Sequence, residues 1–247
     1  MEGESGRLKD PTEPVSSSKR WGQVRLSILG AFKENSYSLV VNPEYQTDLR
    51  CLIISDSGNV GEGASSLEEA HALLRERVAS ILLLGATPFV IGGGNDQSFP
   101  NAMGLLQHGL PDHRVTVINV DAHLDVRPLK EGKVHSGSPF FMLLESSEWK
   151  AKGCHFVEFA AQGSQCSQAH ADFVTNSGKG SIVWLSDIPR GYSTDNSIRL
   201  PFNSACCQPL LPHLRSEDPS DRTFLSFDID SIRGSDCPVR PLTHASL

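Results

Sequence analysis

Two segments of this chain each run from an apolar stretch rich in strand-forming residues directly into alternating acidic residues. The first, Val115 to Val120, has the composition of a buried strand and is followed by Asp121, His123 and Asp125. On an extended chain alternate side chains point to the same side, so the two carboxylates and the imidazole are expected to converge. A solvated turn after the strand is the competing interpretation of this motif taken alone.

The second segment makes the metal interpretation much stronger. Thr223 to Phe227 reads as a strand and runs into Asp228 and Asp230, which share one face of an extended chain with Ser226. Clustered carboxylates repel one another unless a cation lies between them. Two such strand ends therefore predict a metal centre. Carboxylate and imidazole ligands suit Mn, Fe, Co or Zn, and the absence of thiolate argues against a structural zinc site.

Predicted strands and helices alternate along the chain. A capping-box pattern over Ser65 to Glu69 starts a helix that Gly85 ends, and Ser138 followed by proline starts another. This alternation predicts an α/β fold with a parallel sheet, whose sites lie outside the carboxyl ends of the strands, where Asp121 and Asp228 fall. The remaining predicted strands are Ser38 to Val41, Cys51 to Ser55, Thr87 to Ile91, His155 to Ala160 and Ser181 to Leu185.

Two further polar residues lie in loops near predicted strand ends. Asn95 follows three consecutive glycines, which let the backbone approach another group closely. A phosphate-binding loop is the rival interpretation, but neither GxGxxG nor GxxxxGK[ST] is present. His135 lies just before a predicted helix and downstream of the acidic motif, which makes it a candidate for proton transfer.

The composition is that of a soluble globular protein, with 247 residues, 38% hydrophobic and 21% charged. The net charge of −7 and the lack of a basic cluster argue against a nucleic-acid partner. No apolar segment is long enough to span a membrane, and residues 1–20 resemble a disordered tail without a signal peptide. Six scattered cysteines without a CxxC pair suit reduced thiols, so we expect a cytoplasmic protein.

The motifs GGGNDQS, DAHLD, HSGSPF and SFDIDS, in this order, resemble those of the ureohydrolases: arginase, agmatinase and formiminoglutamase. Within that family, GGGND and DAHLDVRP are most similar to formiminoglutamase. The resemblance covers roughly residues 52–238, within a predicted domain of residues 21–238. It implies a three-layer α/β/α sandwich with a central parallel sheet, two Mn²⁺ ions that share a bridging hydroxide, and a possible homo-oligomer.

The resemblance also implies roles for individual residues. His135 and Asp125 would handle protons, and Arg127 would bind the amino-acid end of an anionic substrate. The implied reaction is hydrolysis of a C–N bond in a formimino or guanidino compound, first among them N-formimino-L-glutamate, giving L-glutamate and formamide. The implied metal ligands are Asn95, at a position where most of the family has histidine, Asp121, His123, Asp125, Asp228 and Asp230.

The end of the chain departs from the family pattern. The sequence stops at Leu247, soon after Asp230, and residues 239–247 do not resemble the family's C-terminal region. We therefore expect the C-terminal part of the family fold to be missing. This leaves a second interpretation open, a catalytically weak or inactive ureohydrolase-like protein with a binding or regulatory role.

Overall fold

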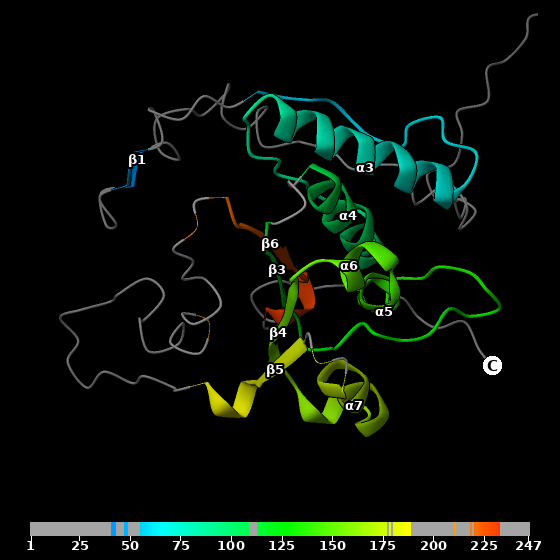
Figure 1. The fold of residues 1–247 in the computed structure, drawn as a ribbon, viewed down its shortest axis with the longest axis vertical. Coiled ribbons are helices and arrows are strands. Elements are labelled where there is room, and N and C mark those ends of the chain that lie inside the picture. The colour runs from blue at the N-terminus through cyan, green and yellow to red at the C-terminus, as the bar shows by residue number, and fades with distance from the viewer. Residues whose placement is uncertain are drawn as a thin grey trace, which may run out of the picture.

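A parallel sheet forms the centre of the structure, which is a computed structural model. It describes residues 41–42, 47–48, 55–108, 113–176, 178, 180–188, 210, 218 and 220–232. The sheet contains β3 (Val115–Val120), β4 (His155–Ala161), β5 (Gly180–Trp184) and β6 (Arg222–Phe227). The strand order is β5-β4-β3-β6 and all three pairings are parallel, which confirms the predicted sheet (Figure 1).

The described helices lie on one side of this sheet. Figure 1 shows α4 between the sheet and α3, with α5, α6 and α7 near the same face. None of the described helices is long and apolar enough to cross a membrane. The helices are α3 (Leu67–Leu83), α4 (Ser98–His108), α5 (Pro139–Glu145), α6 (Ser147–Ala151) and α7 (Gln168–Asn176). Single 3-10 turns cover Asn95–Gln97, Gly163–Gln165, Leu185–Asp187 and Ile229–Ser231, and a separate antiparallel pair joins β1 (Val41–Asn42) to β2 (Thr47–Asp48).

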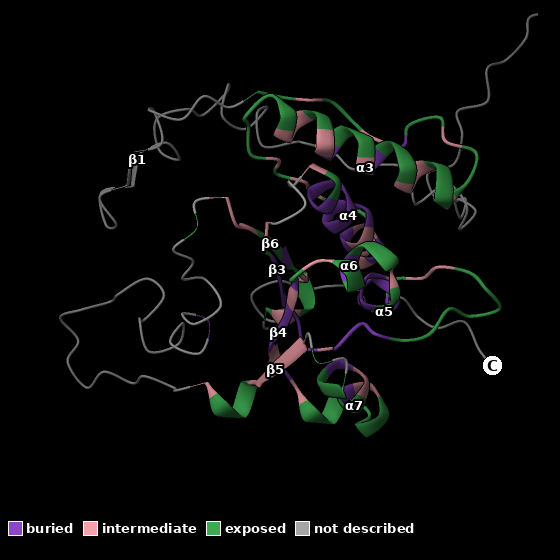
Figure 2. Cartoon of the chain, viewed as in Figure 1, coloured by how far each residue is buried: buried purple, intermediate pink, exposed green. Residues whose placement is uncertain are grey.

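The hydrophobic core lies between the sheet and this helical side. Val117 of β3 and Phe156 of β4 are fully buried against Phe140 of α5 and neighbouring apolar residues. Figure 2 shows the buried residues gathered on α4 and the central strands, while α3 is largely exposed. On the opposite face, Ile118 packs near Leu210. The described residues thus contain one helical layer and the sheet, and the third layer of the predicted sandwich stays a prediction.

Helix α3 begins and ends near the predicted residues. Ser66 is the N-cap and its hydroxyl accepts a 3.1 Å hydrogen bond from the backbone N–H of Glu69. The Glu69 carboxylate accepts from Ser65 instead of Ser66, so the capping box is present with a shifted partner. Gly85 follows the helix with a φ of +73°, which suits glycine at a helix end.

Close approach of α3 and α4 depends on Gly104. A Cβ atom at this position would lie 2.8 Å from the backbone oxygen of Arg75 and 2.9 Å from Val78 of α3. Because only a hydrogen atom fits at this position, α3 and α4 can pack closely together.

One predicted strand is wrong and two others fall mostly outside the described residues. Residues 86–92 are described but pair with no strand in the described part of the chain, and Phe89 is 66% exposed. Apolar β-branched residues favour a strand, but a strand also needs a neighbour to pair with, which the local sequence does not specify. The predicted strands near residues 38–41 and 51–55, and both predicted tails, lie largely or wholly outside the described residues.

Candidate metal centre

The sheet brings the two acidic motifs together. In the parallel pairing of β3 with β6, Val120 is opposite Phe227, so both strands end at the same edge. Asp121 follows the first strand and Asp228 the second, and the backbone N–H of Asp228 donates a 2.9 Å hydrogen bond to the oxygen of Val120. The predicted meeting of the two motifs at the carboxyl edge of the sheet is confirmed.

The local geometry differs from the extended chain that the alternation suggests. The carboxylate of Asp121 accepts from the backbone N–H of His123 at 2.8 Å, and that of Asp228 accepts from Asp230 at 3.0 Å. Such bonds to the N–H two residues on are typical of aspartate turns. Asp125 has a φ of 43°, in the left-handed region. The side chains therefore converge because the chain turns at each strand end, and the expectation of an extended chain there is wrong.

Two overlapping groups of side chains can each hold a cation. Asp121, His123 and Asp230 form one group, and Asp121, Asp125 and Asp228 form the other. In each group the ligand atoms lie within 4.8 Å of one another. Asp121 belongs to both, so its carboxylate can bridge two ions.

The electrostatics of these groups suit the binding of a cation. Burial raises the pKa of Asp121 and Asp228, and burial together with the Asp121 carboxylate raises the pKa of Asp125 to about 7. Hydrogen bonds to Asp121 and Asp230 raise the pKa of His123 to about 10, and the same contact lowers the pKa of Asp230. The raised pKa values of these carboxyl groups reflect negative charges gathered in a buried place, and a divalent cation can neutralise them because every donor is a carboxylate or an imidazole.

Asn95 lies beside the second group. Its Nδ2 atom donates to Oδ2 of Asp125 at 2.7 Å and to Oδ2 of Asp121 at 3.3 Å. Its Oδ1 atom accepts from the hydroxyl of Ser98 at 2.7 Å, and Ser98 lies 2.8 Å from the hydroxyl of Ser226. All six residues that the motifs predict as ligands are thus brought together.

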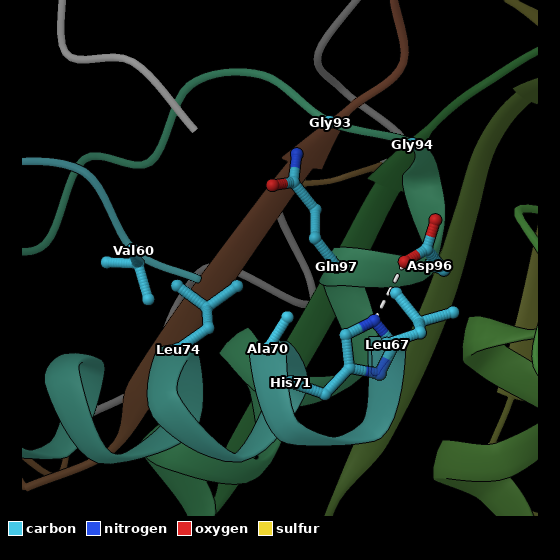
Figure 3. Close-up of a pocket in the computed structure, with 9 residues that line it drawn as sticks. All are labelled: Val60, Leu67, Ala70, His71, Leu74, Gly93, Gly94, Asp96 and Gln97. Atoms are coloured by element: carbon cyan, nitrogen blue, oxygen red, sulfur yellow. Dashed lines mark hydrogen bonds and ion pairs between the residues drawn. The ribbon is translucent and has the colours of Figure 1, made fainter. Parts of the chain in front are cut away.

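The loop that carries Asn95 is fixed to α3 by the residue that follows it. Nε2 of His71 lies 2.7 Å from Oδ2 of Asp96, and the side chains are 12% and 4% exposed (Figure 3). Figure 3 also shows the Gln97 side chain running up towards Gly93. His71 is thus a packed histidine paired with an acid.

Arg127 and His135 lie on the loop beside the cluster. Nη2 of Arg127 is 3.7 Å from Oδ1 of Asp125, and its side chain is 54% exposed. Nε2 of His135 donates to the oxygen of Pro128 at 3.0 Å, and Nδ1 accepts from the N–H of Gly137 at 3.2 Å. These hydrogen bonds hold His135 within its own loop rather than on the acidic cluster.

Two buried polar residues were missed by sequence reasoning. Nδ2 of Asn119 donates to Asp121 at 3.2 Å and to both oxygens of Glu158 at 3.2 Å. Burial raises the pKa of Glu158 well above its ordinary value, with the Asp121 carboxylate as the next cause. The available signal is a polar amide or carboxyl residue among the apolar residues of each strand, VTVINV and HFVEFAA.

The family can now be assigned. A model of the arginase family matches residues 27–186. The chain belongs to the arginase family. It is 34% identical over 186 residues to the formimidoylglutamase of Aeromonas salmonicida. The aligned region covers 75% of this chain and 54% of that protein. The chain spans about half the length of the curated relatives that it matches.

Solved structures agree with this assignment to the arginase family. The structure of Trypanosoma cruzi formiminoglutamase with Mn²⁺ is 40% identical, with a TM-score of 0.68 over 89% of this chain and 67% of that one. The Bacillus subtilis formimidoylglutamase is 19% identical with a TM-score of 0.67 over 91% of this chain and 65% of that one, which supports the fold alone.

Proposed function

We propose that this chain is a Mn²⁺-dependent hydrolase that converts N-formimino-L-glutamate and water into L-glutamate and formamide. The observation that carries the proposal is the pair of ligand groups that share Asp121. The relatives named formimidoylglutamase, and the T. cruzi formiminoglutamase structure with Mn²⁺, support the choice of substrate and metal. Five of the six implied ligand positions keep the family's residue, Asn95 being the exception, and this favours a hydrolase over an inactive relative.

The metal would be held by the two groups of side chains at the edge of the sheet. Bound Mn²⁺ would lower the pKa of a water from about 15.7 towards about 7, so that hydroxide is available at neutral pH. Binding requires His123 to lose the proton that it carries in the metal-free cluster. The proposed ligands are Asn95, Asp121, His123, Asp125, Asp228 and Asp230.

The chain's own residues would handle the protons. Asp125, whose carboxylate lies beside the guanidinium of Arg127, would accept a proton from the attacking water. Cleavage of the C–N bond leaves the glutamate nitrogen in need of a proton. His135 would supply that proton from its imidazolium form, which becomes a neutral ring on losing it. Its Nε2 atom, which bonds to the oxygen of Pro128, would have to turn towards the substrate.

Arg127 would select the anionic substrate. Its guanidinium is half-exposed beside Asp125 and can pair with a substrate carboxylate through two hydrogen bonds. The net charge of −7 fits a small-molecule partner better than a nucleic acid. A cytoplasmic location and a homo-oligomeric state stay predictions.

The test is an assay of L-glutamate release from N-formimino-L-glutamate by the Mn²⁺-loaded chain, with agmatine and L-arginine as alternative substrates. We expect release from the formimino substrate alone, and a higher KM in Arg127→Gln. The matched control is Lys130→Gln, which removes an exposed cation of the same loop and should leave KM unchanged. A folded, Mn²⁺-loaded chain that releases no glutamate would overturn the proposal.

A further inference from the structure

The amide of Asn95 faces its cluster with the wrong atom for a metal ligand. Its Nδ2 hydrogens point at Asp125 and Asp121, at 2.7 and 3.3 Å. An amide NH₂ group only donates hydrogen bonds, and the oxygen is the atom that can bind a cation. Asn95 can therefore act as a ligand only if its oxygen takes the place of its nitrogen.

On its other side the amide contacts the hydroxyl of Ser98, which can donate a hydrogen bond to the amide oxygen or accept one from the amide nitrogen. Ser98 donates its single hydroxyl proton to Oδ1 of Asn95, so the 2.8 Å bond between Ser98 and Ser226 must have Ser226 as the donor. If the amide turns by half a rotation, Nδ2 faces Ser98. The Ser98 hydroxyl can then accept from Nδ2 and donate to Ser226.

We propose that Ser98 and Ser226 are positioning residues for Asn95: metal binding turns the Asn95 amide by half a rotation, and the hydroxyl pair reverses its hydrogen-bond direction in response. The inference rests on the proposed metal centre and adds the residues that make a neutral amide usable as a ligand. Each hydrogen bond between Asn95, Ser98 and Ser226 is replaced by another between the same residues.

The burial of the pair makes this reversal important. Ser98 is 3% exposed and Ser226 is 7% exposed, so water does not readily replace either hydroxyl. Without Ser98, the turned amide would leave an N–H of the partly buried Asn95 without its acceptor, which proteins tolerate less well than a carbonyl oxygen without a donor. Removal of the Ser98 hydroxyl should therefore destabilise the metal-bound state more than the metal-free state.

The positions of the two serines in the fold support the same role. Ser98 begins α4, and Ser226 lies on β6 two residues before Asp228. The pair thus joins the loop that carries Asn95 to the strand that carries part of the same ligand group. Ser226→Ala should have a smaller effect than Ser98→Ala, because Ser98 can still accept from the amide.

The first test is a Mn²⁺ titration of the full chain, followed by the electron paramagnetic resonance signal of free Mn²⁺. We expect Ser98→Ala to weaken one of the two bound ions by about tenfold and to leave the other nearly unchanged. The matched control is Ser146→Ala, which removes a hydroxyl bonded to Trp149 and Leu143 at the start of α6 and should change neither affinity.

A carboxylate background separates this role from simple packing. In Asn95→Asp both side-chain oxygens only accept, so Ser98 donates with and without metal and no reversal is needed. Adding Ser98→Ala to Asn95→Asp should then change the affinity by much less than adding it to the wild type. Equal losses in both backgrounds would overturn the inference in favour of a packing role.

A structure of the wild-type chain with Mn²⁺ gives a second test that needs no variant. The inference predicts that the Asn95 oxygen faces the ion and its nitrogen faces Ser98; neutron diffraction distinguishes the two atoms. If the ion is bound while the nitrogen still faces Asp125, this inference alone is overturned. If the folded wild-type chain binds no Mn²⁺, the proposed function fails with it.

Discussion

Nδ1 of His123 lies 3.1 Å from Oδ2 of Asp230, so the two acidic motifs of the chain are in direct contact. The contact exists because β3 and β6 are adjacent, parallel and in register at their carboxyl ends. After the hydrogen bond to Asp121, this contact is the next cause of the raised pKa of His123, and it lowers the pKa of Asp230, since each group favours the charged form of the other.

Asn95→His should increase the affinity for the ion that Asp121, Asp125 and Asp228 would hold. A neutral amide oxygen is a weaker donor to a transition metal than an imidazole nitrogen. Competition for Mn²⁺ against a chelator of known affinity measures the change. Weaker binding in the folded variant would show that Asn95 is not a ligand, or that the site has no space for the ring.

Gly137→Ala should disable Arg127 without unfolding the chain. A Cβ atom on Gly137 would overlap the guanidinium of Arg127, which is the movable end of a flexible side chain. We expect KM for the anionic substrate to rise by about tenfold, which corresponds to the loss of one charged hydrogen bond, with little change in kcat. Gly153→Ala, where the added Cβ would meet nothing within 4 Å, is the matched control. An unchanged KM would remove Arg127 from the substrate site.

Gly104→Ala should destabilise the packing of α4 against α3. The added Cβ would meet backbone and side-chain atoms of α3 at 2.8 and 2.9 Å, which cannot move without shifting that helix. Overpacking costs about 1–3 kcal/mol, against a gain in helix propensity of at most about 1 kcal/mol. Urea denaturation should show a net loss of about 1–2 kcal/mol. Stability equal to that of the wild type would mean that the two helices separate easily.

The metal-free chain should lose stability as the pH rises. The folded pKa of Asp125 is raised from 3.8 to about 7, so the folded state binds this proton more tightly than the unfolded state. The stabilisation is full below 3.8 and is lost as the pH rises through about 7. The pKa values of Asp121 and Asp228 are raised as well, so their contributions to stability change with pH in the same direction. The pKa of Asp230 is lowered, so its contribution to stability is lost only at acid pH.

Urea denaturation of the chelator-treated protein at about pH 5 and about pH 8 tests this linkage. The free energy of unfolding should be larger at the lower pH, and the difference should shrink in Asp125→Asn. A free energy that increases towards the higher pH would show that the carboxylates are compensated by other charges.

The sequence predicts well that the acidic motifs meet, because their signal is local and chemical. Acids that directly follow an apolar strand mark its carboxyl end, and two such ends in a parallel sheet must lie at one edge. The meeting of Asp121 and Asp228 was predictable for this reason. The turns that bring Asp125 and Asp230 inwards were not, because the alternation of the sequence equally suits an extended chain.

Contacts between distant elements were harder to predict. His71 and Asp96 meet only because α3 packs over α4, and Glu158 is polar in a strand whose position beside β3 depends on strand order. The failed strand over residues 87–91 has the same cause, since composition favours a strand but does not provide the neighbour that completes it.

The most direct test of the account is the Mn²⁺ content of the purified full chain after loading and removal of free metal. We expect about two ions per chain, one for each ligand group. Asp230→Asn should retain about one, and Asp121→Asn, which alters the residue shared by both groups, should retain almost none. A folded wild-type chain without bound Mn²⁺, or an Asp121→Asn variant that still binds both ions, would contradict it.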